Sequence, residues 1–337
     1  MTSIQKIPYA SLLIKEVCEE LHLWVWIEPD YWYVGYIEYP NGKKHLFKNT
    51  NFNINPLWSI EICKDKEYCA LFLKKFWYQV PEWEVFFGET MNQRIEKKKT
   101  IDDGKRYALS IGFPLIIKPN NLSQGVWVMK LLHESEYMEA ALYILQKTQT
   151  FRIEKFYSGN DYRIVVFDDE IISAYQRIPL QITGDGHHTI WELLRIKQEI
   201  FSHNGRDTII DLTDPRMIKN IKRSQYTFDT ILLESQVFQL LDNANLSTWW
   251  ESIDVTEKIH KDFQNIAIRS TYDMWLRLSW VDIIVWDITK SIEDNHNNYI
   301  ILEINGAPWL DNYLCSWAKQ REYVKNLYKK IILALWL

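Results

Sequence analysis

VDIIVWDI, residues 281–288, and IILEIN, residues 300–305, are short apolar runs rich in β-branched residues. Such runs are typical of buried strands. Asp282 lies near the start of the first run and Glu303 within the second, and Asn305 follows two residues after Glu303. Because residues i and i+2 of a strand point to the same face, Glu303 and Asn305 project together, and an antiparallel neighbour would bring Asp282 beside them. Two carboxylates and an amide oxygen suit Mg²⁺ bound to substrate phosphates; the plain alternative is three polar residues at strand ends.

The composition is that of a soluble globular protein. The chain has 337 residues, of which 47% are hydrophobic and 25% charged, enough for two or three packed units. Its net charge of −5 gives no basic footprint for nucleic acid. No apolar run reaches the roughly 18 residues of a membrane span. Early acidic residues argue against a signal peptide, and four cysteines without CxxC spacing indicate neither zinc nor disulfides. We therefore expect a cytoplasmic protein with no nucleic-acid or membrane partner.

The remaining pattern mixes helices and strands. Helical spacing of apolar residues is present in residues 60–76 and 254–278. PLIIK, residues 114–118, and GVWVMK, residues 125–130, are expected to form two strands around a turn. The mixture predicts the α+β class.

Three short features could contact a nucleotide. Lys118 ends an otherwise apolar strand, where it could reach a phosphate as a point charge, although such a lysine more often keeps its charge in water at a strand edge. Lys66, in CKDKEY, is less specific, and Gly125 lies in a loop where glycine would let the backbone approach phosphate.

The third feature is EKFYSGND, residues 154–161, in which acids surround a glycine turn. Backbone groups and the carboxylates of Glu154 and Asp161 could hold an adenine edge and a ribose. Taken alone, this segment is better explained as an ordinary charged hairpin.

In this order, the motifs resemble those of the ATP-grasp ligases. The resemblance is closest to the ATP-grasp half of cyanophycin synthetase and to the glutathione-synthetase domains of fused bacterial enzymes, and it spans about residues 50–315. The matching stretches are FPLIIKPNNLSQGV, EKFYSGNDYRIVV, RIPLQITGDGHHTIWELL and VDIIVWDI with IILEIN. The D-alanine–D-alanine ligases have the same general order of motifs but lack the DYR and GDG…T motifs.

The resemblance implies an ATP-grasp fold with three parts. These are an N-terminal α/β unit in residues 1–100, a central lid in residues 101–160 and a C-terminal unit with the metal site in residues 161–337. It also implies ATP and Mg²⁺ as cofactors and an amino acid or peptide as substrate, and leaves homo-oligomerisation open.

The resemblance also assigns roles to residues. Those expected to bind the nucleotide contact its phosphates, adenine or ribose: Lys66, Lys118, Gly125, Glu154, Lys155, Phe156, Tyr157 and Asp161. The expected Mg²⁺ ligands are Asp282, Glu303 and Asn305. Arg163 and Arg177, the catalytic candidates, would lie near the phosphoryl group or the acceptor carboxylate.

The implied reaction is the ligation of a carboxylate to an amine. ATP activates the carboxylate as an acyl phosphate, and the amine attacks to give an amide, ADP and phosphate, while cations neutralise charge and a lid excludes water. No GxxGK[ST] run is present, so this chain is not expected to be the whole two-reaction cyanophycin enzyme. A glutathione-synthetase-like ligase is equally open, and the rival from another class is a catalytically inactive nucleotide-binding protein. The sequence does not identify the acyl and amine substrates.

The tryptophan content is abnormal. The chain has 16 Trp and 11 Gly, whereas a usual glycine content of about 7% would give roughly 24. The resemblance places Trp127 where the phosphate loop has glycine, and the same holds for Trp58, Trp77, Trp83, Trp249, Trp250, Trp280, Trp286 and Trp309.

We therefore expect a gene that uses UGA as a glycine codon. The tryptophans should then lie on turns and loops, best seen at Trp83, Trp249, Trp250 and Trp309, and Trp127 should intrude on the phosphate loop. Some should adopt backbone angles that are rare for residues other than glycine. The alternative is a degenerate protein that contains these tryptophans.

Overall fold

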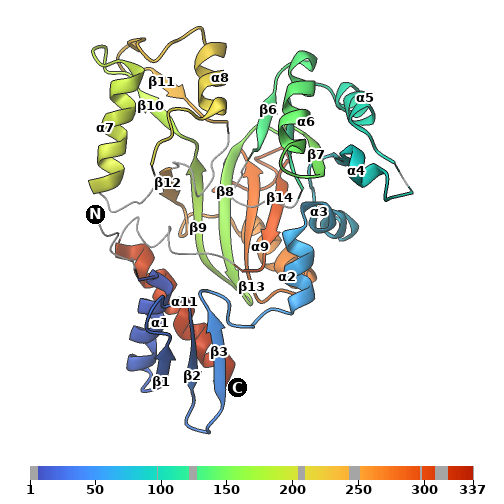
Figure 1. The fold of residues 1–337 in the computed structure, drawn as a ribbon. Helices are drawn as coiled ribbons and strands as arrows, with labels where there is room; N and C mark the ends of the chain where they lie inside the picture. The colour runs from blue at the N-terminus through green and yellow to red at the C-terminus, as the bar shows by residue number, and fades with distance from the viewer. Residues whose placement is uncertain are drawn as a thin grey trace.

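A central antiparallel sheet organises the molecule (Figure 1). The computed structural model describes residues 7–96, 98–120, 127–203, 209–242, 251–296, 298–307 and 318–336. The sheet has the order β12-β9-β8-β13-β14. Its strands are β8 (Asn160–Phe167), β9 (Glu170–Ile178), β12 (Glu251–Asp254), β13 (Leu278–Val285) and β14 (Ile300–Asn305). The prediction of two neighbouring antiparallel strands near residues 281–288 and 300–305 is confirmed by the β13–β14 pair.

The two faces of this sheet differ in character. Helix α9 (Lys261–Asp273) covers one face, where Phe263 and Ala267 pack in one buried cluster with Val281 and Ile283. The alternate residues of the same strands, which carry most of the polar side chains, point to the other face. The predicted helix over 254–278 is shorter than expected and starts after its N-cap, His260.

The N-terminal unit is completed by the C-terminal helix. It consists of α1 (Tyr9–Glu20), β1 (Trp24–Ile27), β2 (Val34–Glu38) and β3 (Lys44–Lys48), and α11 (Ala318–Trp336) packs beside α1 (Figure 1). Leu13 and Val17 share a buried cluster with Leu327 and Ile331. The Tyr39 hydroxyl donates a hydrogen bond to the carbonyl oxygen of Ile332 at 2.8 Å. Residues from the two ends of the described chain therefore form one core.

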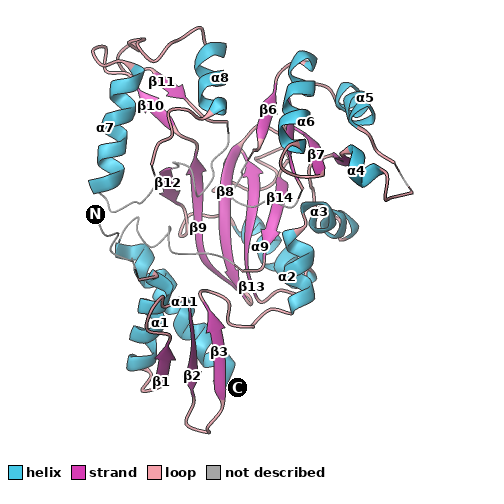
Figure 2. Cartoon of the chain, in the orientation of Figure 1, coloured by secondary structure: helices cyan, strands magenta, loops and turns pink. Residues whose placement is uncertain are grey.

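A second, four-stranded sheet is covered by helices (Figure 2), and we call this part the lid after the unit predicted in residues 101–160. Its order is β4-β7-β5-β6. The elements are β4 (Trp83–Phe87), α4 (Glu89–Asn92), α5 (Ile101–Ile111), β5 (Leu115–Pro119), β6 (Met129–Leu131), the 3-10 turn η1 (Glu134–Glu136), α6 (Tyr137–Leu145) and β7 (Thr150–Lys155). The lid has its own core, which includes Phe86, Ile117, Tyr137 and Phe151. Its predicted range, like the other two domain ranges, stays a prediction.

The helix predicted over residues 60–76 is two helices, α2 (Leu57–Lys64) and α3 (Lys66–Lys75). The chain is extended at Asp65, whose carboxylate accepts hydrogen bonds from the backbone N–H groups of Glu67 at 2.9 Å and Tyr68 at 3.2 Å. This is the N-cap arrangement that starts a helix. Lys66 therefore occupies the first position of α3 rather than a helix interior.

A fourth part, the α7–α8 unit, lies between β9 and β12 in the chain. It consists of β10 (Gln181–Thr183), α7 (Ile190–His203), α8 (Pro215–Arg223) and β11 (Val237–Gln239), with a separate buried cluster. Arg223 of α8 donates to both carboxylate oxygens of Glu136, at 2.6 and 2.8 Å, and Lys219 lies 2.9 Å from the same carboxylate. These ion pairs join the unit to the lid. None of the helices in the described ranges is long and apolar enough to cross a membrane.

Candidate active site

The predicted acidic pair lies side by side on the polar face of the central sheet. Asp282 of β13 is the direct register partner of Glu303 of β14, so both side chains project to one face. The Asn305 side chain points the same way, and its amide donates to Glu303 Oε1 at 3.0 Å. Asp282 is buried, with 2% of its surface exposed. The structure therefore brings the three predicted metal ligands together.

Two arginines hold Asp282 in place. Arg163, its register partner on β8, donates from Nε and Nη2 to the two carboxylate oxygens at 2.7 Å each. Arg177 of β9 donates to both oxygens of Asp161, at 2.6 and 2.8 Å, and its Nη2 lies 2.9 Å from Asp282 Oδ2. We call these four residues, Asp161, Arg163, Arg177 and Asp282, the arginine cluster. Its two positive and two negative charges balance.

Burial shifts the titration of Asp161. It raises the pKa of this carboxyl, the charge of Asp282 adds to the shift, and the ion pair with Arg177 opposes it, so that the pKa lies at about 6. The pKa of Asp161 therefore lies closer to neutral pH than the ordinary aspartate value of 3.8.

A second charged group, the lysine cluster, consists of Lys66, Lys118, Arg152 and Glu154. Lys118 Nζ lies 2.7 Å from Glu154 Oε2. Arg152 Nε lies 2.5 Å from Glu154 Oε1, without the alignment of a hydrogen bond, and Arg152 Nη1 donates to the carbonyl oxygen of Lys66. Arg152 is fully buried, and its Nε and Nη2 have no hydrogen-bond partner in the described structure. Three cations and one carboxylate leave this cluster positively charged.

Lys66 connects the two clusters through Glu303. Its Nζ lies 3.6 Å from Glu303 Oε2. Burial raises the pKa of Glu303, but the charges of Lys66, Lys118 and Arg163 outweigh burial and lower the pKa to about 2. Burial lowers the pKa of Lys118, against the opposing charge of Glu154. Glu303 is thus an ionised carboxylate at neutral pH, in reach of cations from both sides.

The segment expected to hold adenine divides between two sides of the lid sheet. Glu154 points into the lysine cluster, whereas the side chain of Lys155 is exposed, since successive strand residues alternate. The backbone N–H of Lys155 donates to Glu82 O at 2.9 Å. Lys130 Nζ lies 3.9 Å from the ring centroid of Phe156, and the hydroxyl of Tyr157 accepts from the Glu82 N–H at 3.4 Å. Within this segment, Glu154 lies in the lysine cluster and Asp161 in the arginine cluster, and Gly125 lies outside the described residues.

The donor set fits Mg²⁺ bound together with phosphates. Among the described residues, no group of three or more His, Cys, Asp or Glu could hold a metal by itself. The expected ligands are two carboxylates, from Asp282 and Glu303, and the amide of Asn305. Mg²⁺ usually binds one or two carboxylates and completes its shell with water and substrate phosphates.

Sequence reasoning missed two residues of this region. Arg152 stands two residues before Glu154 in the strand FRIEK, and a cation among apolar strand neighbours was the available signal. Trp280 lies on the same face as Asp282, with the guanidinium of Arg163 3.7 Å from its ring centroid. It is 8% exposed, and its indole N–H has no hydrogen-bond partner among the residues that the structure describes.

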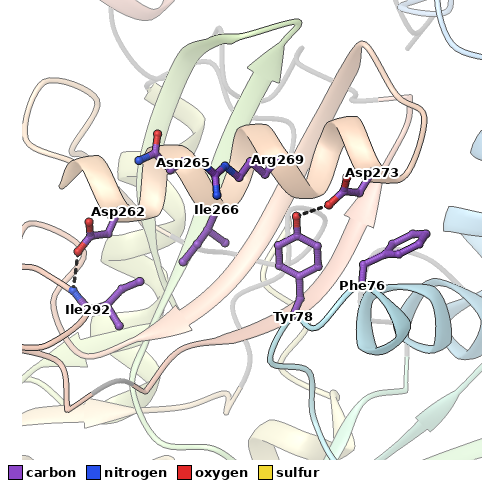
Figure 3. A pocket seen from close by; sticks show the side chains of 8 residues that line it. All are labelled: Phe76, Tyr78, Asp262, Asn265, Ile266, Arg269, Asp273 and Ile292. Carbon is purple, nitrogen blue, oxygen red and sulfur yellow. Dashed lines mark hydrogen bonds between the residues drawn. The ribbon is translucent and has the colours of Figure 1, made fainter.

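A separate hollow of about 450 Å³ lies beside α9 (Figure 3). Its lining includes Tyr78, Asp262, Arg269 and Asp273, and the Tyr78 hydroxyl donates to Asp273 Oδ2 at 2.6 Å. None of the predicted site residues lines it.

The fold is the ATP-grasp fold, as predicted. The bifunctional glutathione synthetase from Pasteurella multocida superposes on 98% of this chain and 45% of its own, with a TM-score of 0.63 and 19% identity. The resemblance to ATP-grasp ligases is confirmed by the sequence relatives. No family profile matches the chain.

In sequence, the chain is similar to cyanophycin synthetases. It is 28% identical to that of Crocosphaera subtropica over 262 residues, which cover 76% of this chain and 29% of the relative. The identity to the enzyme of Geminocystis herdmanii is 31% over 206 residues, or 58% of this chain and 23% of the relative. The glutathione biosynthesis bifunctional protein GshAB of Pasteurella multocida is 25% identical over 234 residues, or 67% of this chain and 31% of the relative. The chain thus matches less than a third of the length of each of these three proteins.

Proposed function

We propose that this chain is an ATP-dependent ligase that joins a carboxylate to an amine through an acyl phosphate. The observation that carries the proposal is the register pairing of Asp282 with Glu303 on a face that Lys66 also reaches. Carboxylates for a metal and lysines for phosphates then meet at one place, as phosphoryl transfer requires. The similarity to synthetases of cyanophycin and glutathione supports the same class.

In this proposal, the nucleotide lies between the lid and the central sheet. Lys66 and Lys118 bind its phosphates, together with the loop that contains Gly125. The chain from Glu154 to Tyr157 borders the adenine, and Asp161 accepts hydrogen bonds from the ribose.

Asp282, Glu303 and Asn305 would hold Mg²⁺, which neutralises phosphate charge when bound. Arg163 and Arg177 form ion pairs with the carboxylate of Asp282 in the present structure. A metal at Asp282 would compete for the same oxygens, and the arginines would then be available for the transferred phosphoryl group or the acceptor carboxylate. One buried Arg163 nitrogen, Nη1, has no hydrogen-bond partner within the described ranges and would be available for such a contact.

The test is ADP release with Mg²⁺ and ATP across pairs of amino acids and short peptides, with product masses recorded. A pair that raises ADP release and yields a product heavier by an amide-linked residue supports ligation. ATP hydrolysis without a joined product for every pair would contradict it.

A second candidate is a nucleotide-binding protein without turnover. Two observations favour it. Two arginines already contact the carboxylate oxygens of Asp282, and the ring of Trp280 packs against the guanidinium of Arg163 on the same face of the sheet. Under this alternative, ATP raises the melting temperature, but no substrate pair releases ADP. Substrate-dependent ADP release excludes it.

A further inference from the structure

We infer that Trp32, Trp77, Trp127 and Trp275 are glycines in the protein that the source cell makes, decoded from UGA codons. The inference concerns the identity of these residues and does not depend on the proposed function. It follows from the backbone that the chain adopts at these positions, from the exposure of the side chains and from the composition.

The backbone angle φ is the first argument. Eleven non-glycine residues in the described structure have a positive φ, and four of them are tryptophans: Trp32 at 64°, Trp77 at 70°, Trp127 at 58° and Trp275 at 57°. Asn, Asp and His, which tolerate this region best, account for five more. A bulky aromatic residue there is an outlier, whereas glycine adopts it without steric cost.

Two of the four tryptophans occupy the position of a helix end that is usually glycine. After α3, the N–H of Trp77 donates to Lys74 O at 3.2 Å and the N–H of Tyr78 donates to Leu73 O at 3.0 Å. This is the Schellman pattern, with Trp77 at the position just beyond the C-cap, Phe76.

The end of α9 repeats this pattern. The N–H of Trp275 donates to Tyr272 O at 2.8 Å, and the N–H of Leu276 donates to Thr271 O at 3.0 Å. His22 after α1 and Gln225 after α8 occupy the same position with φ of 54° and 61°. One non-glycine residue there is thus no proof, and the inference rests on the repeated occurrence of the largest side chain.

Exposure is the second argument. Of the twelve tryptophans in the described ranges, Trp280 is the only one in the buried class. Trp77 is 91% exposed and Trp275 68% exposed, with ring contact to Trp58 at 5.6 Å between centroids. A tryptophan is normally among the most buried side chains on average, because it has a large apolar surface. The rings of Trp77 and Trp275 contribute little to the core, as expected if the natural residues have no side chain, whereas Trp127 packs partly buried against the core of the lid.

The composition agrees with the geometry. The chain holds 16 Trp and 11 Gly, where a typical chain of this length holds roughly 24 Gly. Reading these four tryptophans as glycine would leave 12 Trp and give 15 Gly, which moves both counts toward typical values. UGA accounts for such a pattern, because codon tables differ in whether they read it as stop, tryptophan or glycine.

Other earlier expectations on tryptophan have mixed outcomes. Trp83 is not on a turn but starts strand β4, with the guanidinium of Arg152 4.8 Å from its ring centroid. Trp249, Trp250 and Trp309 lie outside the described residues, as does the loop at residues 121–126 on which Trp127 was expected to intrude. The inference is therefore limited to the four positions with positive φ.

Peptide mass spectrometry of the protein purified from its source cells tests the inference. Trypsin should release residues 270–277, STYDMWLR, which contain Trp275 alone, and residues 76–94, which contain Trp77 and Trp83. Residues 131–147, LLHESEYMEAALYILQK, contain no tryptophan and should appear at their literal mass as a control. We expect residues 270–277 with glycine at position 275, and UGA codons at positions 32, 77, 127 and 275. Tryptophan in that peptide, or UGG at these codons, would overturn the inference.

A matched pair of variants of the literal sequence tests the backbone argument separately. Trp77→Gly should raise the melting temperature by about 2 °C, because it relieves a strained left-handed conformation. Phe76→Gly, at the adjacent exposed aromatic residue with φ of −89°, should lower it. A decrease for both variants would contradict the assignment of position 77 to glycine.

Discussion

The lysine cluster and the arginine cluster each contain four charged side chains, but their charges are balanced differently. In the lysine cluster, Lys118 and Arg152 contact the carboxylate of Glu154, and Lys66 adds a third cation, which lies 3.6 Å from Glu303. In the arginine cluster, each aspartate is held by an arginine, so the charges of the four side chains balance. Both are largely buried, so the difference lies in the net charge rather than in solvent access.

The difference indicates separate tasks under the proposed function. A buried surplus of positive charge is costly unless an anion compensates it, so the lysine cluster is suited to bind phosphates. A neutral cluster in which each carboxylate is held by an arginine is stable without ligand. These ion pairs must break before the cluster can bind a ligand. The lysine cluster is therefore ready for the nucleotide, whereas the arginine cluster should respond to the metal and the acceptor.

The largest expected effect is that of Asp282→Asn. ADP release should fall by more than about 100-fold, since a direct metal ligand should matter more than the outer-shell partners whose loss costs 10- to 100-fold. The free energy of unfolding should fall by about 3 kcal/mol, because two buried arginines lose a charged partner. The matched control is Asp168→Asn, which removes an exposed carboxylate paired with Arg277 at 2.7 Å. Normal turnover in Asp282→Asn, or equal losses in both variants, would contradict the role of Asp282.

The next effect is that of Lys118→Met on nucleotide binding. Loss of a charged contact to phosphate should weaken ATP binding about 10- to 100-fold, measured by calorimetric titration. Lys105→Met, which removes an exposed lid lysine 3.0 Å from Glu134, is the control and should leave ATP affinity unchanged. Unchanged affinity in Lys118→Met would mean that the positive surplus does not serve the phosphates.

Arg152→Met tests whether Arg152 only supports Glu154 or binds the phosphates of ATP directly. Glu154 keeps Lys118 but loses its second cation, so the free energy of unfolding should fall by about 3 kcal/mol in a denaturant titration. ATP affinity should fall less than in Lys118→Met, because Arg152 is fully buried behind Glu154 and the Lys66 backbone. A larger loss of affinity than in Lys118→Met would make Arg152 a direct phosphate ligand instead.

The smallest effect is the pH dependence of nucleotide affinity. Below pH of about 6, Asp161 becomes protonated and a weaker acceptor for the ribose, so ATP affinity should fall several-fold as the pH is lowered through this value. Asp161→Asn should bind ATP weakly at all pH values and lose this dependence. An unchanged pH profile in Asp161→Asn would assign the titration to another group.

The same pKa shifts predict which acids control acid stability. The folded-state pKa of Asp161 is raised above its ordinary 3.8, so protonation of this group favours the folded state and does not cause acid unfolding. The pKa of Glu303 is lowered from 4.5 to about 2, so its contribution to stability is present above pH 4.5 and is lost as the pH falls through this window. Glu303→Gln should flatten the loss of stability over that range.

Much of the fold and site could be predicted, because strand alternation carries the information. The two carboxylates lie in two apolar strands, and the antiparallel pairing of β13 with β14 places them opposite each other. The break between α2 and α3 was missed because Asp65 fits a helix interior by spacing, although its carboxylate caps the next helix. The same alternation implies that Lys155 points away from Glu154, although the family resemblance assigns both residues to the nucleotide. The pairing of Arg163 with Asp282 depends on the register of β8 against β13, which no local pattern reveals.

The core shared by α1, β1–β3 and α11 has a consequence for synthesis on the ribosome. Tyr39 and Phe52 emerge early, yet their partners Ile332 and Tyr328 are translated near the end of the described chain. The 293 positions that separate Tyr39 from Ile332 take roughly 15 to 60 seconds to translate at about 5 to 20 residues per second. The N-terminal unit can therefore complete its core only after the intervening parts of the chain have been translated. Nascent chains that stop before α11 should expose the apolar faces of the N-terminal unit and be captured by chaperones.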